Sequence, residues 1–453
     1  MTAQCSPVVI VGAGAAGLKA ALWAARGPRP VLVLEGSQRP GQKILISGGG
    51  RCNALPAQAA PADFITHGSP HSLAKILRAW PLAEVQRFFE EDLGVPLRLE
   101  AETGKLFPAS NRARTVLDAL LTAVSQRGAT IRLGARVAGL AREGEGWLVQ
   151  LASGETIMAS RVVLATGGLS APATGSDGTG LRMAQALGHA LIPTYPALVP
   201  LTTDNSAHRG LAGVSLTVTL TVAAAQTPVG AGLAPAQGDR KGSPLRIRGG
   251  FLFTHRGYSG PAVLNVSHVA ARAISAGDPR PPIFVQWCDP GAAILDAKLC
   301  AATGLVLSTL RDYLPERLAI LLLAEMKLTE VNLAQLPRSK RRQLVEALTR
   351  YPLPWTGHEG YRVAEVTAGG VPLAEVNPAT LESRLAPGLH LCGELLDAFG
   401  PIGGYNFLWA WVTGRVAGEA CQYDRAVSSV SKNTSTIGRR GGTGTNVQET
   451  VAL

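Results

Sequence analysis

The feature that most constrains the fold is a glycine-rich turn between an apolar run and a helix near the start of the chain. Residues 8–12 are typical of a buried parallel strand, and residues 14–26 have the composition of a helix rich in small side chains. A second apolar run, at 31–35, ends in an acidic residue. Strand, helix and strand therefore follow one another as a βαβ unit, which predicts an α/β protein with a parallel sheet.

The glycine spacing of this turn is that of a dinucleotide-binding Rossmann fold. Its first glycine permits the tight turn, its second lets the backbone approach a pyrophosphate, and its third lets the helix pack on the strand. The acid at the end of the second strand can accept hydrogen bonds from ribose hydroxyls. The residues predicted to bind the dinucleotide here are Gly12, Gly14, Ala15, Ala16, Gly17 and Glu35.

The turn alone does not separate FAD from NAD, and a later strand favours FAD. Residues 161–165 are expected to form a strand that runs into Thr166 and Gly167, in a turn that recurs in FAD-binding Rossmann proteins. We expect both residues to contact the cofactor, which would be bound noncovalently.

A third segment, at 389–406, strengthens the prediction of FAD. A strand is followed by Gly393 and Glu394, and the carboxylate of Glu394 is placed to bind ribityl hydroxyls, with Asp397 as the rival candidate. A helix N-terminus then follows, which can face the flavin pyrimidine carbonyl, where negative charge grows on reduction. The residues expected at this N-terminus are Gly404, Tyr405 and Asn406.

Changes in composition along the chain predict an insertion inside the Rossmann domain. We expect a first FAD-domain segment at 1–194, a β-rich inserted domain at 195–290 and a helical part of the insertion at 291–360. The second FAD-domain segment is expected at 361–424. Residues 425–453 are rich in Ser, Thr and Gly, and this composition predicts a disordered tail.

Charge and cysteine content narrow the class of protein. The net charge of +11 can favour nucleic acid, an anionic membrane or an anionic cofactor. The basic runs have neither interleaved aromatics nor a nucleic-acid motif, so we do not expect nucleic acid as a partner. The six cysteines form no CxxC pair, which fits a reducing compartment and argues against a flavin disulfide reductase. The uncharged stretch at 210–238 alternates like a strand, so we expect a soluble cytoplasmic protein without a membrane segment.

The sequence resembles the bacterial aminoacetone-oxidase-type (BaiN-like) flavoproteins, within the glutathione-reductase-like FAD superfamily. The resemblance spans residues 8–423, and its most specific segments are 42–53, 103–113, 164–180, 253–267, 364–371 and 393–418. It implies an FAD-binding Rossmann-type domain interrupted by an inserted β-barrel-like part and a helical part. In such proteins the loop after the second strand runs beside the flavin, and a backbone amide pair reads the adenine edge. These implications add Lys43, Gly49, Gly50, Arg51, Asn53 and Val137 to the expected cofactor site.

The sequence identifies neither the catalytic residue nor the substrate. His255 is a candidate proton donor or substrate ligand, with a structural hydrogen bond at a strand end as the alternative. The other histidines show no metal-ligand spacing. No second GxGxxG follows, so NAD(P)H is expected only as a transient reductant. We therefore expect an FAD-dependent oxidoreductase that acts on a small molecule with NAD(P)H or oxygen as redox partner. The alternatives are an RNA-acting flavoprotein and a non-catalytic flavin-binding protein.

Overall fold

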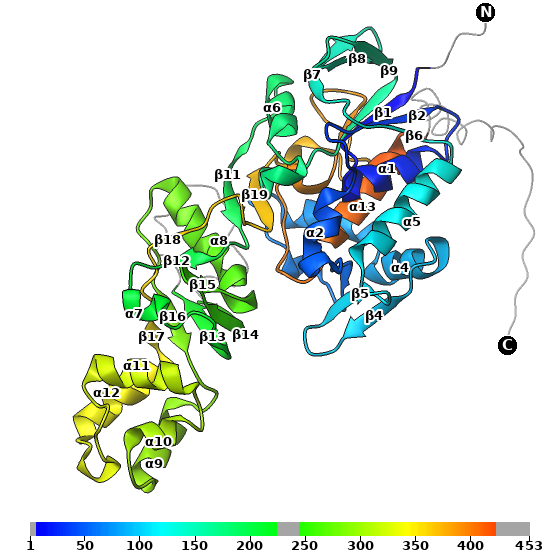
Figure 1. The fold of residues 1–453 in the computed structure, drawn as a ribbon. Coiled ribbons are helices and arrows are strands. Elements are labelled where there is room, and N and C mark those ends of the chain that lie inside the picture. The colour runs from blue at the N-terminus through cyan, green and yellow to red at the C-terminus, as the bar shows by residue number, and fades with distance from the viewer. Residues whose placement is uncertain (1–5, 224–243, 423–453) are drawn as a thin grey trace, which may run out of the picture.

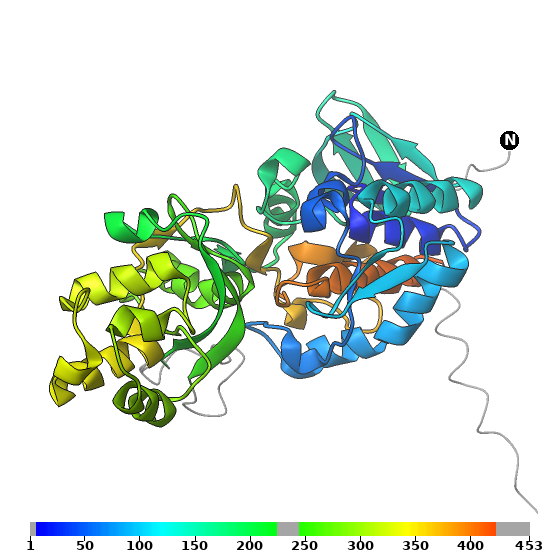
Figure 2. The ribbon, with the colours of Figure 1, turned by 60° about the horizontal axis from the view of Figure 1, so that its bottom comes forward.

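The computed structural model describes residues 6–223 and 244–422. The expected tail at 425–453 lies outside these residues. The chain forms two halves, a parallel-sheet half that holds both ends of the described chain and an inserted half (Figures 1 and 2).

The parallel-sheet half is built on the βαβ unit that the sequence predicts. β1 (Val8–Val11) and β2 (Val31–Leu34) pair in parallel, and α1 (Ala15–Ala24) connects them. β6 (Thr130–Arg132), β10 (Arg161–Leu164) and β20 (Leu389–Leu391) complete a parallel sheet in the order β20-β10-β1-β2-β6. All four residues of β1 are buried, which explains why this strand is a continuous apolar run rather than an alternating one. The expected α/β fold class is confirmed.

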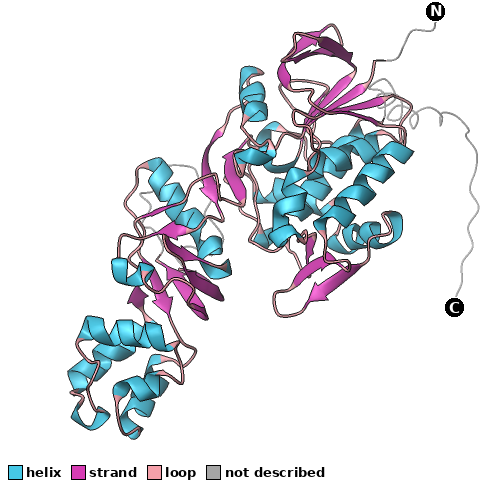
Figure 3. Ribbon diagram, viewed as in Figure 1, coloured by secondary structure: helices cyan, strands magenta, loops and turns pink. Residues whose placement is uncertain are grey.

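Helices cover one side of this sheet, and a small antiparallel sheet lies at the other (Figures 1 and 3). The helices are α1, α5 (Ala113–Gln126) and α13 (Tyr405–Ala420), and the small sheet contains β7 (Val137–Glu143), β8 (Gly146–Leu151) and β9 (Thr156–Ala159). α1 and α13 lie very close together, because Gly414 and Gly418 have no side chains to separate them. A Cβ added at Gly414 would lie 2.4 Å from the carbonyl oxygen of Ala16.

The chain between residues 70 and 92 forms a broken helix rather than a continuous one. α3 (Pro70–Arg78) is followed by α4 (Leu82–Arg87) and by a π-helical turn at Phe88–Asp92. Pro81 stands directly before α4, and proline cannot continue the hydrogen-bonding pattern of a preceding helix. Next along the chain, β4 (Leu97–Glu100) and β5 (Lys105–Pro108) form a hairpin beside β3 (Leu55–Pro56).

The chain enters the inserted half through β11 (Ile192–Ala197) and returns through β19 (Val366–Gly370), and these two strands pair antiparallel. The inserted half contains a seven-stranded antiparallel sheet with β17 (Tyr351–Pro352) and β18 (Gly357–His358) at its edges. Between them lie β16 (Ile283–Gln286), β13 (Ser215–Val222), β14 (Leu245–Phe253), β15 (Gly257–Ser259) and β12 (Leu201–Thr202).

The helices of the inserted half divide into two groups. α8 (Pro261–Ala276) packs against the antiparallel sheet, where Gly249 of β14 lets Ala262 approach. The second group forms the end of the molecule farthest from the parallel sheet (Figure 1) and falls within the expected helical part. Its members are α9 (Ala292–Ala301), α10 (Val306–Leu310), α11 (Glu316–Met326) and α12 (Arg338–Thr349). No helix in the described part of the chain combines the length and apolarity needed to cross a membrane.

A lysine is buried in the core of the parallel-sheet half. Lys19 of α1 has 0% of its surface exposed, and its Nζ has no hydrogen-bond partner among the described residues. The ammonium lies 3.9 Å from the ring centre of Trp23, 4.0 Å from that of Trp80 and 2.8 Å from that of Phe88. Burial, followed by repulsion from Arg415, lowers the pKa of Lys19 well below its usual value. The three rings attract the charged form, and burial opposes it.

We predict that Lys19→Met stabilises the protein. Removing the buried amine should raise the free energy of unfolding by ~1 kcal/mol and the Tm by about 2 °C. A base whose pKa is depressed by folding destabilises the fold below its unfolded-state pKa, so the advantage of methionine should shrink as pH rises toward about 10. Thermal melts at neutral and alkaline pH measure this effect. Lys75→Met, at an exposed position of α3, is the matched control and should leave the Tm nearly unchanged. A lower Tm for Lys19→Met would show that the rings stabilise the cation more than burial destabilises it.

Candidate active site

A cavity of about 670 Å³ runs from the turn after β1 to the strands that connect the two halves. Its volume is in the range of cofactor and ligand sites. Most residues that the sequence predicts to bind FAD line this cavity. They are Gly12, Gly14, Ala15, Ala16, Glu35, Lys43, Gly49, Arg51, Asn53, Val137, Thr166, Gly167, Gly393, Glu394, Gly404 and Asn406.

The three glycines of the first turn have different structural roles. Gly12 has a φ of 102°, and a Cβ there would lie 2.6 Å from the carbonyl oxygen of Ala165. A Cβ at Gly17 would lie 1.8 Å from the carbonyl oxygen of Gly12, so both of these glycines are required by the turn itself. Gly14 has an ordinary extended backbone, and a Cβ there would meet nothing within 4 Å. The space beside Gly14 belongs to the cavity, at the helix N-terminus where free amides favour a phosphate.

Glu35 lies at the end of β2, with its carboxylate held by the backbone. Its Oε2 accepts a hydrogen bond from the amide of Ala13 at 2.8 Å, and its Oε1 accepts one from the amide of Ser37 at 2.9 Å. An ionised carboxylate has about four acceptor positions. Glu35 can therefore still accept hydrogen bonds from the ribose hydroxyls of a nucleotide.

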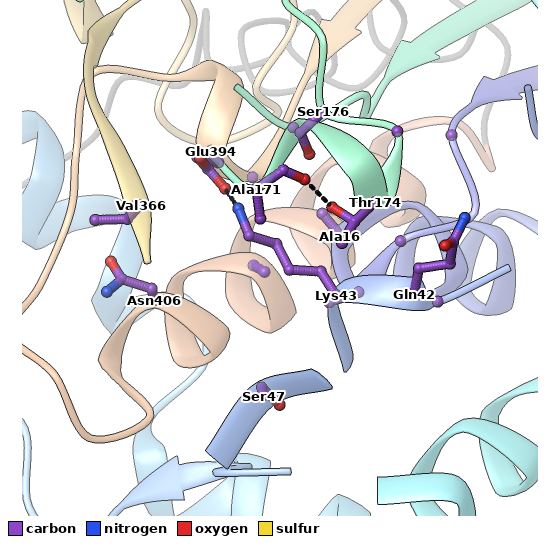
Figure 4. A pocket seen from close by; sticks show the side chains of 18 of the residues that line it. Ala16, Gln42, Lys43, Ser47, Ala171, Thr174, Ser176, Val366, Glu394 and Asn406 are labelled. Carbon is purple, nitrogen blue, oxygen red and sulfur yellow. Dashed lines mark hydrogen bonds and ion pairs between the residues drawn. The ribbon is translucent and has the colours of Figure 1, made fainter. Parts of the chain in front are cut away.

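Glu394 lies in the middle of the cavity and interacts with side chains from distant segments. Its Oε2 accepts a hydrogen bond from Nζ of Lys43 at 2.6 Å, and its Oε1 accepts one from the amide of Thr367 at 2.9 Å. Lys43 extends from α2 (Gln42–Gly50) across the cavity to this carboxylate (Figure 4). The hydroxyl of Ser170 contacts both groups.

The environment of Glu394 favours its ionised form. Burial alone would raise the pKa of Glu394, but the charge of Lys43 and the hydrogen bonds from Lys43, Ser170 and Thr367 outweigh burial and lower it. The ionised carboxylate therefore stabilises the fold above the usual glutamate pKa of about 4.3. This contribution is lost as pH falls through the folded-state value.

The C-terminal end of α2 forms a wall of the cavity with little side-chain bulk. Gly48, Gly49 and Gly50 have successive φ values of 56°, 68° and 84°, in the left-handed region that favours glycine. Beyond them, the Arg51 guanidinium lies 4.0 Å from the ring centre of Phe107. Asn53 is buried, and its Oδ1 has no hydrogen-bond partner among the described residues. A buried acceptor beside a cavity fits a bound ring that offers an N–H group, as the flavin does.

Four of the expected cofactor residues do not line the cavity. Gly17 lies behind the turn, and Gly50 ends the glycine run without reaching the cavity. The Tyr405 ring packs edge-on against Phe64, with ring centres 5.8 Å apart, so this side chain belongs to the core. The fourth residue, Asp397, is fully buried.

The carboxylate of Asp397 is held by other side chains and by the backbone. Its Oδ2 accepts hydrogen bonds from the amide of His67 at 2.7 Å and from Oγ1 of Thr66 at 3.1 Å, and its Oδ1 lies 2.9 Å from Nδ1 of His67. The far nitrogen of the His67 ring lies 3.3 Å from the hydroxyl of Tyr195 on β11. The structure therefore gives Asp397 a position in the core and Glu394 the position in the cavity.

His255 is exposed and does not line the cavity. It lies in the tight turn between β14 and β15, where the backbones of Thr254 and Gly257 exchange hydrogen bonds. The candidate catalytic role of His255 is therefore not supported by its position.

Cys52 is packed in the core. It is buried, forms no disulfide with another cysteine of the described residues, and has a φ of 61°. Burial raises the pKa of the Cys52 thiol to about 12, so the thiol is not a reactive thiolate at neutral pH.

Sequence reasoning missed the residues at the other end of the cavity, where the two halves meet. These residues lie in or near β11, β19, the hairpin β4–β5 and the start of α13, which are far apart in the sequence. No local sequence pattern could therefore predict that they lie together. The segment 364–371 was recognised as specific, but none of its side chains was assigned a role. The residues at this end include Lys105, Leu198, Arg362, Glu365, Val366 and Ile402.

Together, the parallel sheet, the N-terminal turn and the cavity define an FAD-dependent oxidoreductase. The chain belongs to the family described as the HI0933-like protein Rossmann domain, whose model matches residues 6–420. It is 32% identical over 409 residues to a ribosomal RNA dihydrouridine synthase of Escherichia coli, an alignment that covers 89% of this chain and 94% of that protein. It is 33% identical over 422 residues to a 3-dehydro-bile acid delta(4,6)-reductase of Clostridium scindens, with 91% and 98% covered. Among solved structures, a 3-ketosteroid-delta4-(5alpha)-dehydrogenase of Rhodococcus jostii matches with a TM-score of 0.47 and 16% identity, over 94% of this chain and 99% of that one.

Proposed function

We propose that this protein is an FAD-dependent reductase of a carbon–carbon double bond conjugated with a carbonyl group. The observation that carries the proposal is the near full-length similarity to two reductases with different substrates. Dihydrouridine is uridine in which the ring double bond beside a carbonyl is saturated. A delta(4,6)-reductase of a 3-dehydro-bile acid acts on double bonds conjugated with a ketone. The two named activities therefore share one type of reaction.

We propose a position for each part of FAD from the residues that line the cavity. The N-terminus of α1 would bind the pyrophosphate, and Glu35 the ribose of the adenosine. Glu394 and Lys43 would bind the ribityl chain, and Asn53 the flavin ring. The remaining cofactor candidates line the cavity between these points. Val137 would lie beside the adenine, and Thr166, Gly167 and Gly393 would lie along the ribityl chain. The residues around the flavin ring would be Gly49, Arg51, Gly404 and Asn406. Reduced FAD supplies a hydride to the substrate.

The end of the cavity between the two halves fits an apolar substrate that carries a carbonyl. Leu198 and Ile402 supply apolar surface there, and Lys105 and Arg362 supply positive charge. A cation beside the carbonyl oxygen stabilises the negative charge that develops when the β-carbon accepts a hydride. We propose a nicotinamide dinucleotide as the reductant, bound transiently at the same open end.

Stopped-flow spectroscopy under anaerobic conditions tests this function. NADH or NADPH should bleach the flavin of the purified protein, and a 3-keto-4-ene steroid or a simple cyclic enone should restore its absorbance. A saturated ketone of the same size is the control and should leave the flavin reduced. Bleached flavin that only oxygen reoxidises would contradict the proposal. Reoxidation by ribosomal RNA but by no enone would retain the reaction and identify uracil in RNA as the substrate.

A further inference from the structure

We propose that Glu365 is the proton donor of this reaction, and that its carboxyl group protonates the α-carbon of the substrate double bond. This assignment rests on the proposed function and deepens it. Glu365 lines the cavity at the end where the two halves meet.

The backbone of Glu365 is fixed by both connections between the halves. Its amide donates a hydrogen bond to the carbonyl of Leu198 at 3.2 Å, just after β11. Val366, the first residue of β19, follows directly and, like Asn406, lines the cavity (Figure 4). The residue is therefore held beside the proposed position of the flavin ring, on the side of the inserted half.

The carboxylate of Glu365 differs from the other acids of the cavity because it has no partner among the described residues. Glu35 is held by two backbone amides, Asp177 forms an ion pair with Arg136, and Glu394 pairs with Lys43. The Glu365 carboxylate makes no hydrogen bond or ion pair with any other residue in 6–223 or 244–422. Among the acids that line the cavity, it is the one left available to a substrate.

The surroundings of Glu365 favour the protonated form. Glu365 is exposed where it lines the cavity, so its carboxylate is accessible to a substrate. Burial raises the pKa of Glu365, against the smaller opposing effects of Lys43 on α2 and Lys105 on β5. An acid whose pKa is moved toward neutrality is better suited to donate a proton at physiological pH.

Addition of a hydride to the β-carbon moves the electron pair of the double bond onto the α-carbon and the conjugated carbonyl. That electron pair takes the proton of the Glu365 carboxyl group, so an O–H bond breaks and a C–H bond forms. The substrate gains two hydrogens, the nicotinamide dinucleotide is the final reductant, and the Glu365 carboxylate recovers a proton from water.

Glu365→Gln tests the assignment in the two half-reactions. Reduction of the flavin by NADPH or NADH and the flavin content should stay as in the wild type, because glutamine keeps the size of the side chain. Reoxidation by the enone should be at least about tenfold slower, since general acid catalysis contributes about a hundredfold or more. In the wild type this rate should fall as pH rises through a pKa above the usual value for glutamate, and the variant should lack that fall.

Glu359→Gln is the matched control on the same connecting segment. Glu359 pairs with Arg256 at 3.2 Å and does not line the cavity, so this variant should behave as the wild type in both half-reactions. Normal reoxidation of Glu365→Gln would overturn the assignment alone. Loss of flavin, or equal slowing of both half-reactions, would also overturn it, because those results indicate a structural role. Failure of every conjugated probe to reoxidise the wild type would overturn the proposed function and this assignment together.

Discussion

Gly14→Val should give a folded protein that binds FAD at least about a hundredfold more weakly, a loss of ~2.7 kcal/mol. The backbone at Gly14 has φ −82° and ψ −170°, which valine adopts without strain, and a Cβ there meets no atom within 4 Å. The branched side chain would instead occupy the part of the cavity proposed for the pyrophosphate. Flavin absorbance of the purified variant and titration of its apoprotein with FAD measure the loss.

Gly291→Val is a closely matched control for this variant. Gly291 precedes the first turn of α9 as Gly14 precedes that of α1, its backbone is extended, and a Cβ there also meets nothing within 4 Å. The two variants should have similar melting temperatures as apoproteins, and only Gly14→Val should lose flavin. Gly17→Val should instead fail to fold, because its Cβ would lie 1.8 Å from the carbonyl oxygen of Gly12. Full flavin occupancy in Gly14→Val would show that the phosphates bind elsewhere.

The sequence predicted the parallel-sheet half well because its signals are local. The strand–turn–helix at 8–26 is encoded by an apolar run, three glycines and a run of small residues, all within a few turns of chain. The strand at 161–165 and the strand preceding Gly393 were likewise recognisable from short apolar runs that end in glycine turns. Each of these signals depends on contacts between near neighbours.

The parts of the site that escaped prediction depend on contacts between distant segments. Asp397 and Glu394 lie three residues apart and are both acidic, but they have different partners. The carboxylate of Asp397 accepts hydrogen bonds from His67 and Thr66. The carboxylate of Glu394 accepts hydrogen bonds from Lys43 and Ser170. The sequence of the segment 393–406 alone does not show which of the two acids faces the cavity. Glu365 was missed for the same reason, because β11, α2 and β5 reach it from other parts of the fold. For His255 the sequence suggested a role that its position does not support. Histidine is a reactive residue type and lies in the recognised segment 253–267, but the structure places it in an exposed turn.

Glu394→Ala should therefore mainly weaken the binding of FAD, whereas Asp397→Ala should mainly lower the stability of the apoprotein. Glu394 faces the cavity, and its carboxylate can accept hydrogen bonds from two ribityl hydroxyls, worth roughly 1.5–3 kcal/mol each. Glu394→Ala should weaken FAD binding at least about tenfold, because water replaces part of the lost interaction. Its effect on the melting temperature of the apoprotein should be smaller, since Lys43 is partly exposed and can be hydrated.

Asp397→Ala should destabilise the apoprotein while the folded fraction keeps its affinity for FAD. The variant leaves the buried His67 amide and the Thr66 hydroxyl without their acceptor, which costs about 1–3 kcal/mol for each group. Thermal melts of the apoproteins and FAD titrations below the melting transition separate the two effects. Asp397→Asn is a more conservative variant, because its amide oxygen can still accept a hydrogen bond from the His67 backbone. It should recover part of the stability.

Loss of FAD affinity in Asp397→Ala with normal affinity in Glu394→Ala would assign the binding of the ribityl chain to Asp397. If neither substitution changed the affinity, the segment 393–406 would not bind flavin, and the proposed cofactor position would depend on the N-terminal unit alone.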